Sequence, residues 1–510
     1  MATSEAARQL LDEHTGDAPS MDKATVADFS VAEPARMSSR DKTVIGVLLV
    51  STFVVLLNET IMSVALPVLM HDLQVDPNTG QWLTAGFLLT MAVIIPITGF
   101  LIRRVPTRTL YGVAMSLFSI GTLTAALAPG FPVLLLARFV QASGTAIMMP
   151  LLMTTVMTLV PPARRGAVMG NMSIVISVAP AIGPTVSGIV LNTLGWRGMF
   201  WTVLPIAVVT LAVGVRKMVT VGEQSDAPID LVSVVLSVLG FGGLVYGLSS
   251  IGQASGAPSV IPVWLPFAVG GIGLVAFILR QVVLQRTDRA LLDLRTFKSK
   301  TFTLASALMA LMMVTLLGTV VILPIYLQDV LRLQPVVTGL LLLPGGLLMG
   351  LLGPVVGRLY DRYGIRALLV PGTVLVSASL WSTTLFTSAS PIWLVLVFHL
   401  LLSVGLAFVF TSLFTGGLAA VEPKLYSYGS AIFATTQQLA GAAGVALLVA
   451  LLSIRSAMLS TGGATQVEST AGGIHLAFLV AAVLSVVGIA GAFLIKTPPK
   501  PADDAAPAGH

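Results

Sequence analysis

The sequence predicts an all-α membrane protein with fourteen transmembrane helices, arranged as two six-helix bundles with one inserted helix pair. Three observations support this prediction. The chain of 510 residues is 55% hydrophobic and only 10% charged, a composition that soluble globular proteins do not have. It contains fourteen apolar segments long enough to span a bilayer. Two stretches of the chain, one in each half, also repeat each other.

The apolar segments begin only after residue 42. Residues 1–42 are polar, end in a basic stretch and lack the apolar core of a signal peptide, so we expect a disordered cytoplasmic tail there. Pro and Gly inside the later segments are compatible with helices in lipid. The segments have the approximate limits 43–69, 79–102, 109–128, 131–157, 167–191, 198–216, 229–250, 260–280, 302–327, 336–357, 366–386, 391–414, 428–454 and 472–495.

The positive charges of the loops predict the orientation. With the N-terminus inside, the inner loops and tails hold 24 Lys and Arg residues, the outer loops hold 3, and Arg138 lies within a helix. Cytoplasmic loops carry such an excess of positive charge, so we expect a multi-pass protein of the cell inner membrane with both termini cytoplasmic. This distribution explains the basic pI near 9.7 without nucleic acid as a partner, because anionic lipid attracts basic loops.

An internal repeat divides the chain into two halves. PITGFLIRRVPTRTL at 96–110 matches PVVGRLYDRYGIRAL at 354–368, at an offset of 258 residues. Parallel repeats are a known transporter architecture, with the site at the bilayer midplane between the halves. We therefore expect a tail at 1–42, an N-terminal six-helix bundle at 43–217, inserted helices 7 and 8 at 218–284, a cytoplasmic amphipathic linker along the membrane surface at 285–300, a C-terminal six-helix bundle at 301–496 and a cytoplasmic tail at 497–510.

Several classes of function find no support in the sequence. The chain has no cysteine, and its five histidines show no metal-ligand spacing. It contains no phosphate-binding loop and no nucleophile elbow. The sequence therefore predicts no enzyme, no metal site and no cofactor. It indicates that an ion gradient, with the proton as the coupling ion, drives any uphill transport.

Glu59 is the most informative residue of the first segment. It lies about 22 Å from the inner end of that segment, within the apolar part of the bilayer. A carboxylate there is costly unless it is paired, hydrated or protonated. Glu59 is therefore a candidate functional residue, and a structural hydrogen bond between packed helices is the alternative.

Arg138 lies at a similar depth in the fourth segment, about 10 Å below the outer surface. A buried arginine needs a partner, so we expect the first and fourth helices to adjoin, with Glu59 and Arg138 interacting directly or through water. An ion pair favours the charged form of a carboxyl group, and removal from water favours the neutral form. Alternation between these environments lets Glu59 take up and release a proton. A purely structural clamp is the alternative for this pair.

His399 occupies the depth of Arg138 in the second half. An imidazole titrates near neutral pH, so His399 is a candidate second proton carrier or substrate contact. A plain hydrogen bond between helices explains it equally well. The fifth segment contains SVAPAIGPTVSG at 177–188, whose small residues permit close approach of helices.

Four motifs carry a family resemblance, and they are LNETIMSVALP at 57–67, RFVQASG at 138–144, AIGPTVSG at 181–188 and GRLYDRYGIR at 357–366. They resemble motifs of the major facilitator superfamily, and in particular of its fourteen-helix drug:proton antiporter family. The details QWLTAGFLLT and PITGFLI are most similar to the lincomycin-resistance branch. The resemblance covers nearly all of residues 43–496 and implies the major facilitator fold.

The residues and the resemblance together suggest three sets of site residues. The proton-coupling set is Glu59, Arg138 and His399. The substrate-binding set is Asn58, Glu59, Arg138, Gln141 and His399. The conformational gating set is Gly183, Pro184, Gly188, Gly357, Asp361, Arg362 and Arg366.

The first segment departs from the family pattern. The family has an acid where Asn58 stands, and this chain has its acid one residue later, at Glu59. One residue turns a helix by about 100°, which can aim Glu59 at a neighbouring helix instead of the cavity.

The first copy of the loop motif also departs from the pattern. Arg103 stands where the family has Asp, and Pro106 where it has Gly. We expect the charge relay of the inner gate to be weaker there. In the second copy, Asp361 with Arg362 and Arg366 keeps the relay.

These observations predict a proton-coupled exporter of amphiphilic drugs or antibiotics, surrounded by membrane lipid and working by alternating access. By analogy with the family, helices 1, 4, 9 and 12 line its cavity. The first alternative is an exporter of the same fold for an endogenous lipid, peptide or siderophore. The second is a membrane interaction or sensory protein without transport, which would tolerate loss of Glu59 and Arg138.

Overall fold

A computed structural model describes residues 37–75, 77–80, 82–221, 228–251, 262, 264–387 and 389–495. Within these residues every regular element is a helix, as the apolar segments predict. Most of the predicted N-terminal tail and the whole C-terminal tail lie outside the described residues. The first long helix, α2, begins at Ser39, before the expected boundary, because the Ser38 side chain accepts a hydrogen bond from the backbone N–H of Asp41 and caps the helix.

The helices of the first half and of the inserted pair follow the order of the segments. The first half comprises α2 (Ser39–Asp72), the short α3 (Pro77–Gly80), α4 (Trp82–Arg104), α5 (Thr107–Ala126), α6 (Phe131–Leu159) and α7 (Arg165–Lys217). The inserted pair comprises α8 (Leu231–Ser237), which continues through the π turn η2 (Val238–Gly242) into α9 (Gly243–Ile251), and α10 (Trp264–Leu284).

The second half follows after the linker. It comprises α11 (Lys300–Ile325), which ends in the π turn η5 (Tyr326–Val330), then α12 (Pro335–Ser382), α13 (Ile392–Ala419), α14 (Tyr426–Thr461) and α15 (Gln466–Leu494).

Two of these helices each contain two predicted segments. In α7 the helical path breaks at Gly195 (φ 67°), and in α12 it breaks at Gly364 (φ 79°); glycine adopts these left-handed values without a steric penalty. The described residues form 13 helices that are long and apolar enough to cross a membrane. One of them, Val336–Leu385, has 50 residues. Because this helix includes the break at Gly364, the 13 helices correspond to the fourteen predicted segments.

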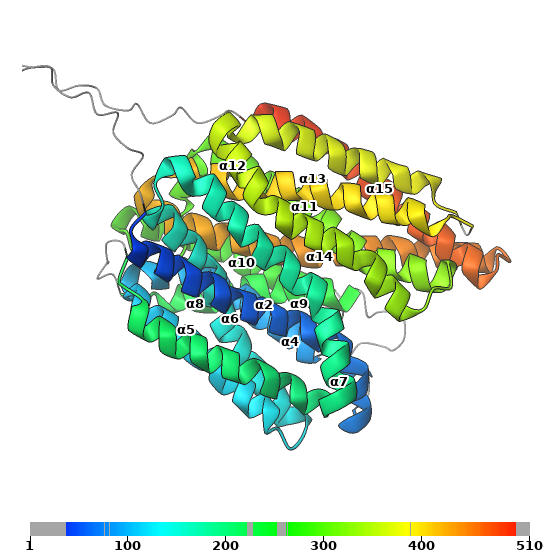
Figure 1. The fold of residues 1–510 in the computed structure, drawn as a ribbon, viewed down its shortest axis with the longest axis horizontal. Helices are drawn as coiled ribbons and strands as arrows, with labels where there is room; N and C mark the ends of the chain where they lie inside the picture. The colour runs from blue at the N-terminus through cyan, green and yellow to red at the C-terminus, as the bar shows by residue number, and fades with distance from the viewer. Residues whose placement is uncertain are drawn as a thin grey trace, which may run out of the picture. The chain divides into compact units, whose positions relative to one another are not determined.

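The long helices run side by side, and each half packs mainly against itself (Figure 1). Two seams join the halves: α7 packs against α12, and α4 packs against α14. The inserted pair lies beside the second seam, because α9 contacts both α4 and α14. We call the end of the helices that holds the start of α2 and the charged residues Arg108, Arg164, Arg165 and Arg216 the basic end.

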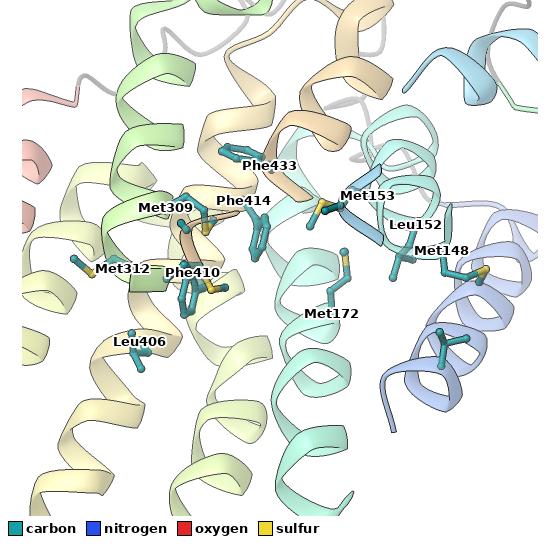
Figure 2. Packing of buried hydrophobic residues seen from close by; sticks show 14 of the residues in the cluster. Met148, Leu152, Met153, Met172, Met309, Met312, Leu406, Phe410, Phe414 and Phe433 are labelled. Atoms are coloured by element: carbon teal, nitrogen blue, oxygen red, sulfur yellow. The ribbon is translucent and has the colours of Figure 1, made fainter. Parts of the chain in front are cut away.

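A buried cluster of methionine and phenylalanine side chains lies between the two halves (Figure 2). Met153 of α6 and Met172 of α7 belong to the first half, and Phe410, Phe414 and Phe433 to the second. The centroid of the Phe414 ring lies 5.9 Å from that of Phe433 and 6.4 Å from that of Phe410. From their helix positions, these residues lie roughly 8–14 Å from the basic end. Apolar side chains therefore interlock the halves there.

The linker at 285–300 differs from the expectation of an amphipathic segment along the membrane surface. It forms two short 3₁₀ turns, Gln285–Thr287 and Leu294–Lys298. Residues 290–293 between the turns are buried, so their apolar side chains pack into the protein instead of into lipid. Asp288 has a left-handed backbone conformation (φ 54°), which ends the first turn before a longer helix can form.

Candidate functional site

The first part of the candidate site lies on α2. Asn58 is buried, only 3% exposed, and its side-chain Nδ2 has no hydrogen-bond partner among the described residues. Glu59 beside it is half-buried. Helix α2 packs against α7 and α6, so these two polar residues lie within the first half, where α2 meets its neighbours.

Arg138 of α6 is the largest fully buried side chain of the described residues, at 1% exposure. Its Nε donates to the carbonyl oxygen of Leu83 at 3.3 Å, and its Nη1 donates to Oε1 of Gln141 at 2.9 Å. The guanidinium carbon lies 4.1 Å from the centroid of the Phe87 ring, a cation–π distance. Neutral groups of α4 and α6 therefore hold the arginine in place.

Glu59 and Arg138 come close without forming an ion pair. The expected contact between their helices is present, and the two charges interact electrostatically. No nitrogen–oxygen contact within the 4.0 Å of a salt bridge joins them in the described structure. The Arg138 cation is thus attracted to a carboxylate that it does not hold, and an interaction through water stays a prediction.

Gln141 lies in a buried hydrogen-bond network of the first half, and its contact with substrate stays a prediction. It is fully buried, accepts from Arg138 and donates through Nε2 to Oγ1 of Thr122 at 2.8 Å. These bonds link α6 to α5 and orient the arginine. The structure therefore places Gln141 as a support of Arg138.

His399 of α13 faces α12. Its Nε2 lies 2.9 Å from the carbonyl oxygen of Leu342, and its buried Nδ1 has no partner among the described residues. The ring packs against Gly345, where any larger residue would collide with it. The structure thus contains the helix–helix hydrogen bond that was one of the interpretations of this residue, and it leaves one ring nitrogen unused.

Two of the predicted gating residues, Gly357 and Asp361, lie at the seam between α7 and α12. The carboxylate of Asp361 accepts the backbone N–H groups of Gly166 at 2.7 Å and Ala167 at 2.9 Å. These groups belong to the first turn of α7, where the helix dipole and free N–H groups favour an anion. Gly357 lies one helical turn before Asp361, and a side chain there would collide with the carbonyl oxygen of Gly166. A carboxylate of the second half thus caps a helix of the first.

The expected charge relay of Asp361 with Arg362 and Arg366 is absent from the described structure. Arg362 lies 5.2 Å from the centroid of the Tyr363 ring, and Arg366 lies 5.9 Å from that of Phe493. Arg362 precedes the turn at Gly364 and Arg366 follows it. Both guanidinium groups lie near aromatic rings, and no described hydrogen bond or ion pair joins either of them to the acid.

The remaining predicted gating residues lie further along α7. Gly183 is buried against Thr60 of α2, and a side chain at Gly183 would collide with that threonine. Gly188 has open space around it, with no atom within 4 Å of an added Cβ. Pro184 lies within α7. Close packing therefore explains Gly183, whereas no contact explains Gly188.

Further hydrogen bonds between the halves were not predicted from the sequence. Ser173 of α7 and Thr411 of α13 are 2.9 Å apart, and Oγ1 of Thr154 donates to Oγ of Ser430 at 3.1 Å. Each is a common residue with no motif around it, so only the fold could identify it. Together with Asp361, these bonds join the halves within about 12 Å of the basic end. By a closed basic end we mean that the two halves are in contact there.

Comparisons with known proteins agree with this architecture. The model of the Major Facilitator Superfamily matches residues 48–445. The uncharacterized MFS-type transporter YcnB of Bacillus subtilis (strain 168) is 41% identical over 461 residues, which cover 90% of this chain and 96% of the relative. The lincomycin resistance protein LmrB of the same organism is 38% identical over 455 residues, covering 88% and 94%. The protein of that name in Listeria monocytogenes is 37% identical, covering 89% and 96%.

A solved structure shows the same fold. The human organic anion transporter MFSD10 (TETRAN) matches with a TM-score of 0.65 over 89% of this chain and 99% of that chain, at 14% sequence identity. The predicted fold, its membrane-spanning character and the resemblance to the major facilitator superfamily are confirmed. With two bundles, an inserted pair and a family match over most of its length, the chain belongs to the Major Facilitator Superfamily, whose members are transporters and not enzymes.

Proposed function

We propose that this transporter is a drug:proton antiporter, which exports amphiphilic drugs or antibiotics across the cell inner membrane. The single observation that carries the proposal is the pair formed by half-buried Glu59 and fully buried Arg138, which attract each other without an ion pair. Glu59 is also the only Asp or Glu inside the twelve predicted segments of the two bundles. Proton coupling therefore has one carboxyl group on which to act.

The hydrogen bonds of Arg138 support different roles for the two charges. The arginine is satisfied by Leu83 and Gln141, so it stays in place whether or not Glu59 is ionised. It acts as a fixed positive charge that stabilises the carboxylate. The Glu59 carboxyl has no hydrogen bond from the described residues, so a proton can reach it without first breaking a bond.

Proton and substrate then compete for the same part of the transporter. With Glu59 ionised, its charge attracts Arg138 and an amphiphilic cation or dipole. Protonation removes that negative charge and weakens binding. A proton taken up from outside thus expels substrate that was bound from inside. His399, with its free Nδ1, is the second residue at which a proton can bind.

The closed basic end fits one state of an alternating-access cycle. The excess of positive charge in the loops of that end supports its assignment to the cytoplasm, with both termini there. Substrate entry from the cytoplasm then requires the contacts of Asp361 with α7 to break. By analogy with the family, α2, α6, α11 and α13 line the pathway that opens.

The substrate class rests on the relatives. Two relatives that match most of this chain are named lincomycin resistance proteins, so lincomycin is the first compound to test. An apolar, methionine-rich interior such as that around Met153 and Met172 accommodates varied ligands, because the methionine side chain is flexible and polarizable.

Transport in proteoliposomes tests the proposal. We expect lincomycin or another amphiphilic drug to release protons from vesicles loaded with an acidic buffer, for the wild type and for the exposed control Glu422→Gln. Glu59→Gln is expected to abolish this release. Drug uptake that ignores the proton gradient would contradict proton coupling, and inactivity toward all drugs would point to an endogenous substrate.

A further inference from the structure

The two seams of the transporter have the same arrangement of elements, but they carry opposite charges at equivalent positions. At the offset of 258 residues, Arg103 at the end of α4 stands at the position of Asp361 in α12. Each seam faces a helix that begins in the same way, since a 3₁₀ turn precedes both α7 (Pro162–Arg164) and α14 (Pro423–Leu425). In the first seam the acid caps the helix, and in the second seam an arginine takes that place.

An arginine beside a helix N-terminus is unfavourable, because the helix dipole places positive charge there. Arg103 nevertheless lies at the start of α14. Its Nη1 donates to the hydroxyl of Tyr428 at 3.4 Å, and the guanidinium carbon is 5.4 Å from the centroid of that ring. Tyr428 is buried, at 2% exposure. Arg103 also lies in the last turn of α4, where the helix dipole favours a cation, and a negative group nearby would offset the repulsion from the start of α14.

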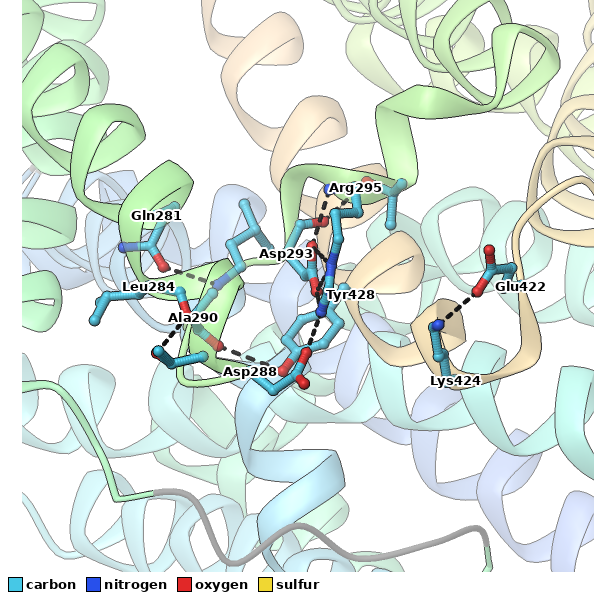
Figure 3. A network of polar contacts seen from close by, with 12 residues as sticks. Gln281, Leu284, Asp288, Ala290, Asp293, Arg295, Glu422, Lys424 and Tyr428 are labelled. Atoms are coloured by element: carbon cyan, nitrogen blue, oxygen red, sulfur yellow. Dashed lines mark hydrogen bonds and ion pairs between the residues drawn. The ribbon is translucent and has the colours of Figure 1, made fainter.

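The linker supplies that negative charge (Figure 3). The Tyr428 hydroxyl donates to the carbonyl oxygen of Ala290 at 3.4 Å, which ties the linker to α14. Asp288 and Asp293 lie on either side of Ala290, and Arg295 bonds both carboxylates. The hydrogen bond from Arg295 holds the pKa of the Asp288 carboxyl below its usual value, and the charges of Arg103 and Lys424 act in the same direction. Asp288 is therefore an anion at neutral pH.

The inserted helix pair holds the linker in this position. Gln281 of α10 is fully buried, and its Oε1 accepts the backbone N–H groups of Leu291 at 2.8 Å and Leu292 at 3.3 Å. Its Nε2 donates to Oγ of Ser233 in α8 at 2.8 Å. The linker is thus bonded to the inserted pair on one side and to α14 on the other.

We propose that the linker replaces the acid missing from the end of α4, so that Asp288, Asp293 and the inserted helix pair form a latch on the seam between α4 and α14. The latch holds the basic end closed by attracting Arg103, as Asp361 holds the other seam by capping α7. Opening this end separates Arg103 and Tyr428 from each other and from the linker. The inserted helix pair, formed by α8 with α9 and by α10, is then the anchor of one gate.

This inference rests on the proposed alternating access. Its test measures directly how often the basic end is open. The chain has no cysteine, so Thr109→Cys and Lys300→Cys, at two exposed positions of different halves, can carry the only spin labels. Double electron–electron resonance then measures the ratio of closed to open protein at pH 5 and pH 8, with and without lincomycin. The variants are Arg103→Gln, Asp288→Asn and their combination, with Glu422→Gln as the control acid of the same end.

We expect Arg103→Gln and Asp288→Asn each to lower the ratio of closed to open protein by about two- to fivefold, as for a partly exposed charge pair. The combined variant is expected to lower it no further, because both changes remove the same interaction. Arg103→Lys, which keeps the charge, is expected to stay near the wild type. If Arg103→Gln does not fold, Asp288→Asn against Glu422→Gln decides the question.

Two results would overturn the latch. An effect of Asp288→Asn no larger than that of Glu422→Gln, in a protein that does alternate, refutes the latch and leaves the proposed transport cycle intact. A wild-type protein that shows one distance under every condition refutes the alternating cycle and the latch together.

Discussion

Asp361 accepts the backbone N–H of Gly166 at 2.7 Å, so a single carboxylate links the second half of the transporter to the first helical turn of α7. The same carboxylate accepts the N–H of Ala167. Charged hydrogen bonds of this kind contribute about 1.5–3 kcal/mol each. Because they cross the seam, they stabilise only the state in which the basic end is closed.

Removing the charge of Asp361 is therefore expected to open this end. In Asp361→Asn the side chain can still accept one hydrogen bond but has lost its charge, so we expect a cost of about 1.5 kcal/mol, or roughly tenfold in the ratio of closed to open protein. Spin labels at the two positions named above measure this ratio. Asp329→Asn, at an exposed position far from this seam along the chain, is the control and should match the wild type.

The glycines of α7 give a matched pair of substitutions. A side chain at Gly170 would collide with the carbonyl oxygen of Gly353, whereas Gly188 has no atom within 4 Å of an added Cβ. We expect Gly170→Ala to separate α7 from α12 and to destabilise the protein by about 1–3 kcal/mol, with loss of transport. Gly188→Ala should be neutral. Thermal unfolding in detergent checks both, and equal effects would show that the seam is not tightly packed.

Arg138 provides a test of the fixed-charge role. We expect Arg138→Ala to abolish export while folded protein remains in the membrane, because the variant loses the cation that attracts Glu59. Arg138→Lys keeps the charge but not the two hydrogen bonds to Leu83 and Gln141, so we expect partial activity. Drug resistance of cells and the amount of protein in their membranes are the measurements. Normal resistance with Arg138→Ala would rule out its role in coupling.

The inserted pair contains an ion pair whose effect on stability can be measured. Asp230 caps α8 and accepts two hydrogen bonds from Arg280, at 2.6 and 2.7 Å. Those bonds lower the pKa of Asp230 in the folded protein. The stabilisation is thus fully present above the unfolded pKa of about 3.9 and is lost only as the pH falls below it.

We therefore expect Asp230→Asn to lower the unfolding free energy by about 1 kcal/mol, since the pair is partly exposed and the cap is weakened. The decrease should be the same at pH 6 and pH 8. Thermal unfolding of both proteins at these two pH values measures it, with Asp329→Asn as control. A difference that changes strongly over this range would show that another group titrates with the pair.

The sequence allowed prediction of the fold because its main signals are local. The lengths of the apolar segments identified the helices. Charged residues at equivalent positions of two loops revealed the repeat. The path of the linker was not predictable, because its apolar residues have helical spacing. The bonds to Gln281 and from Tyr428 instead hold residues 290–293 buried between two short 3₁₀ turns. Such contacts between distant parts of the chain leave no periodic pattern.

The sequence allowed prediction of which residues form the candidate site, but not of their contacts. An intramembrane Glu59 and Arg138 stand out from apolar segments, so their chemistry could be identified. The partners of Arg138 could not, because a backbone carbonyl of Leu83 and the ring of Phe87 have no sequence signal. Asp361 was identified through its motif, but its bond to α7 required the two halves to be placed together.

Proton release on drug binding tests the central claim most directly. Purified wild type and Glu59→Gln, in weakly buffered detergent solution, are mixed with lincomycin and other amphiphilic drugs while the pH is recorded. Competition at Glu59 predicts release from the wild type and from Glu422→Gln, and none from Glu59→Gln. Equal release from wild type and Glu59→Gln would contradict the account and move the proton carrier to another residue, with His399 the next to test.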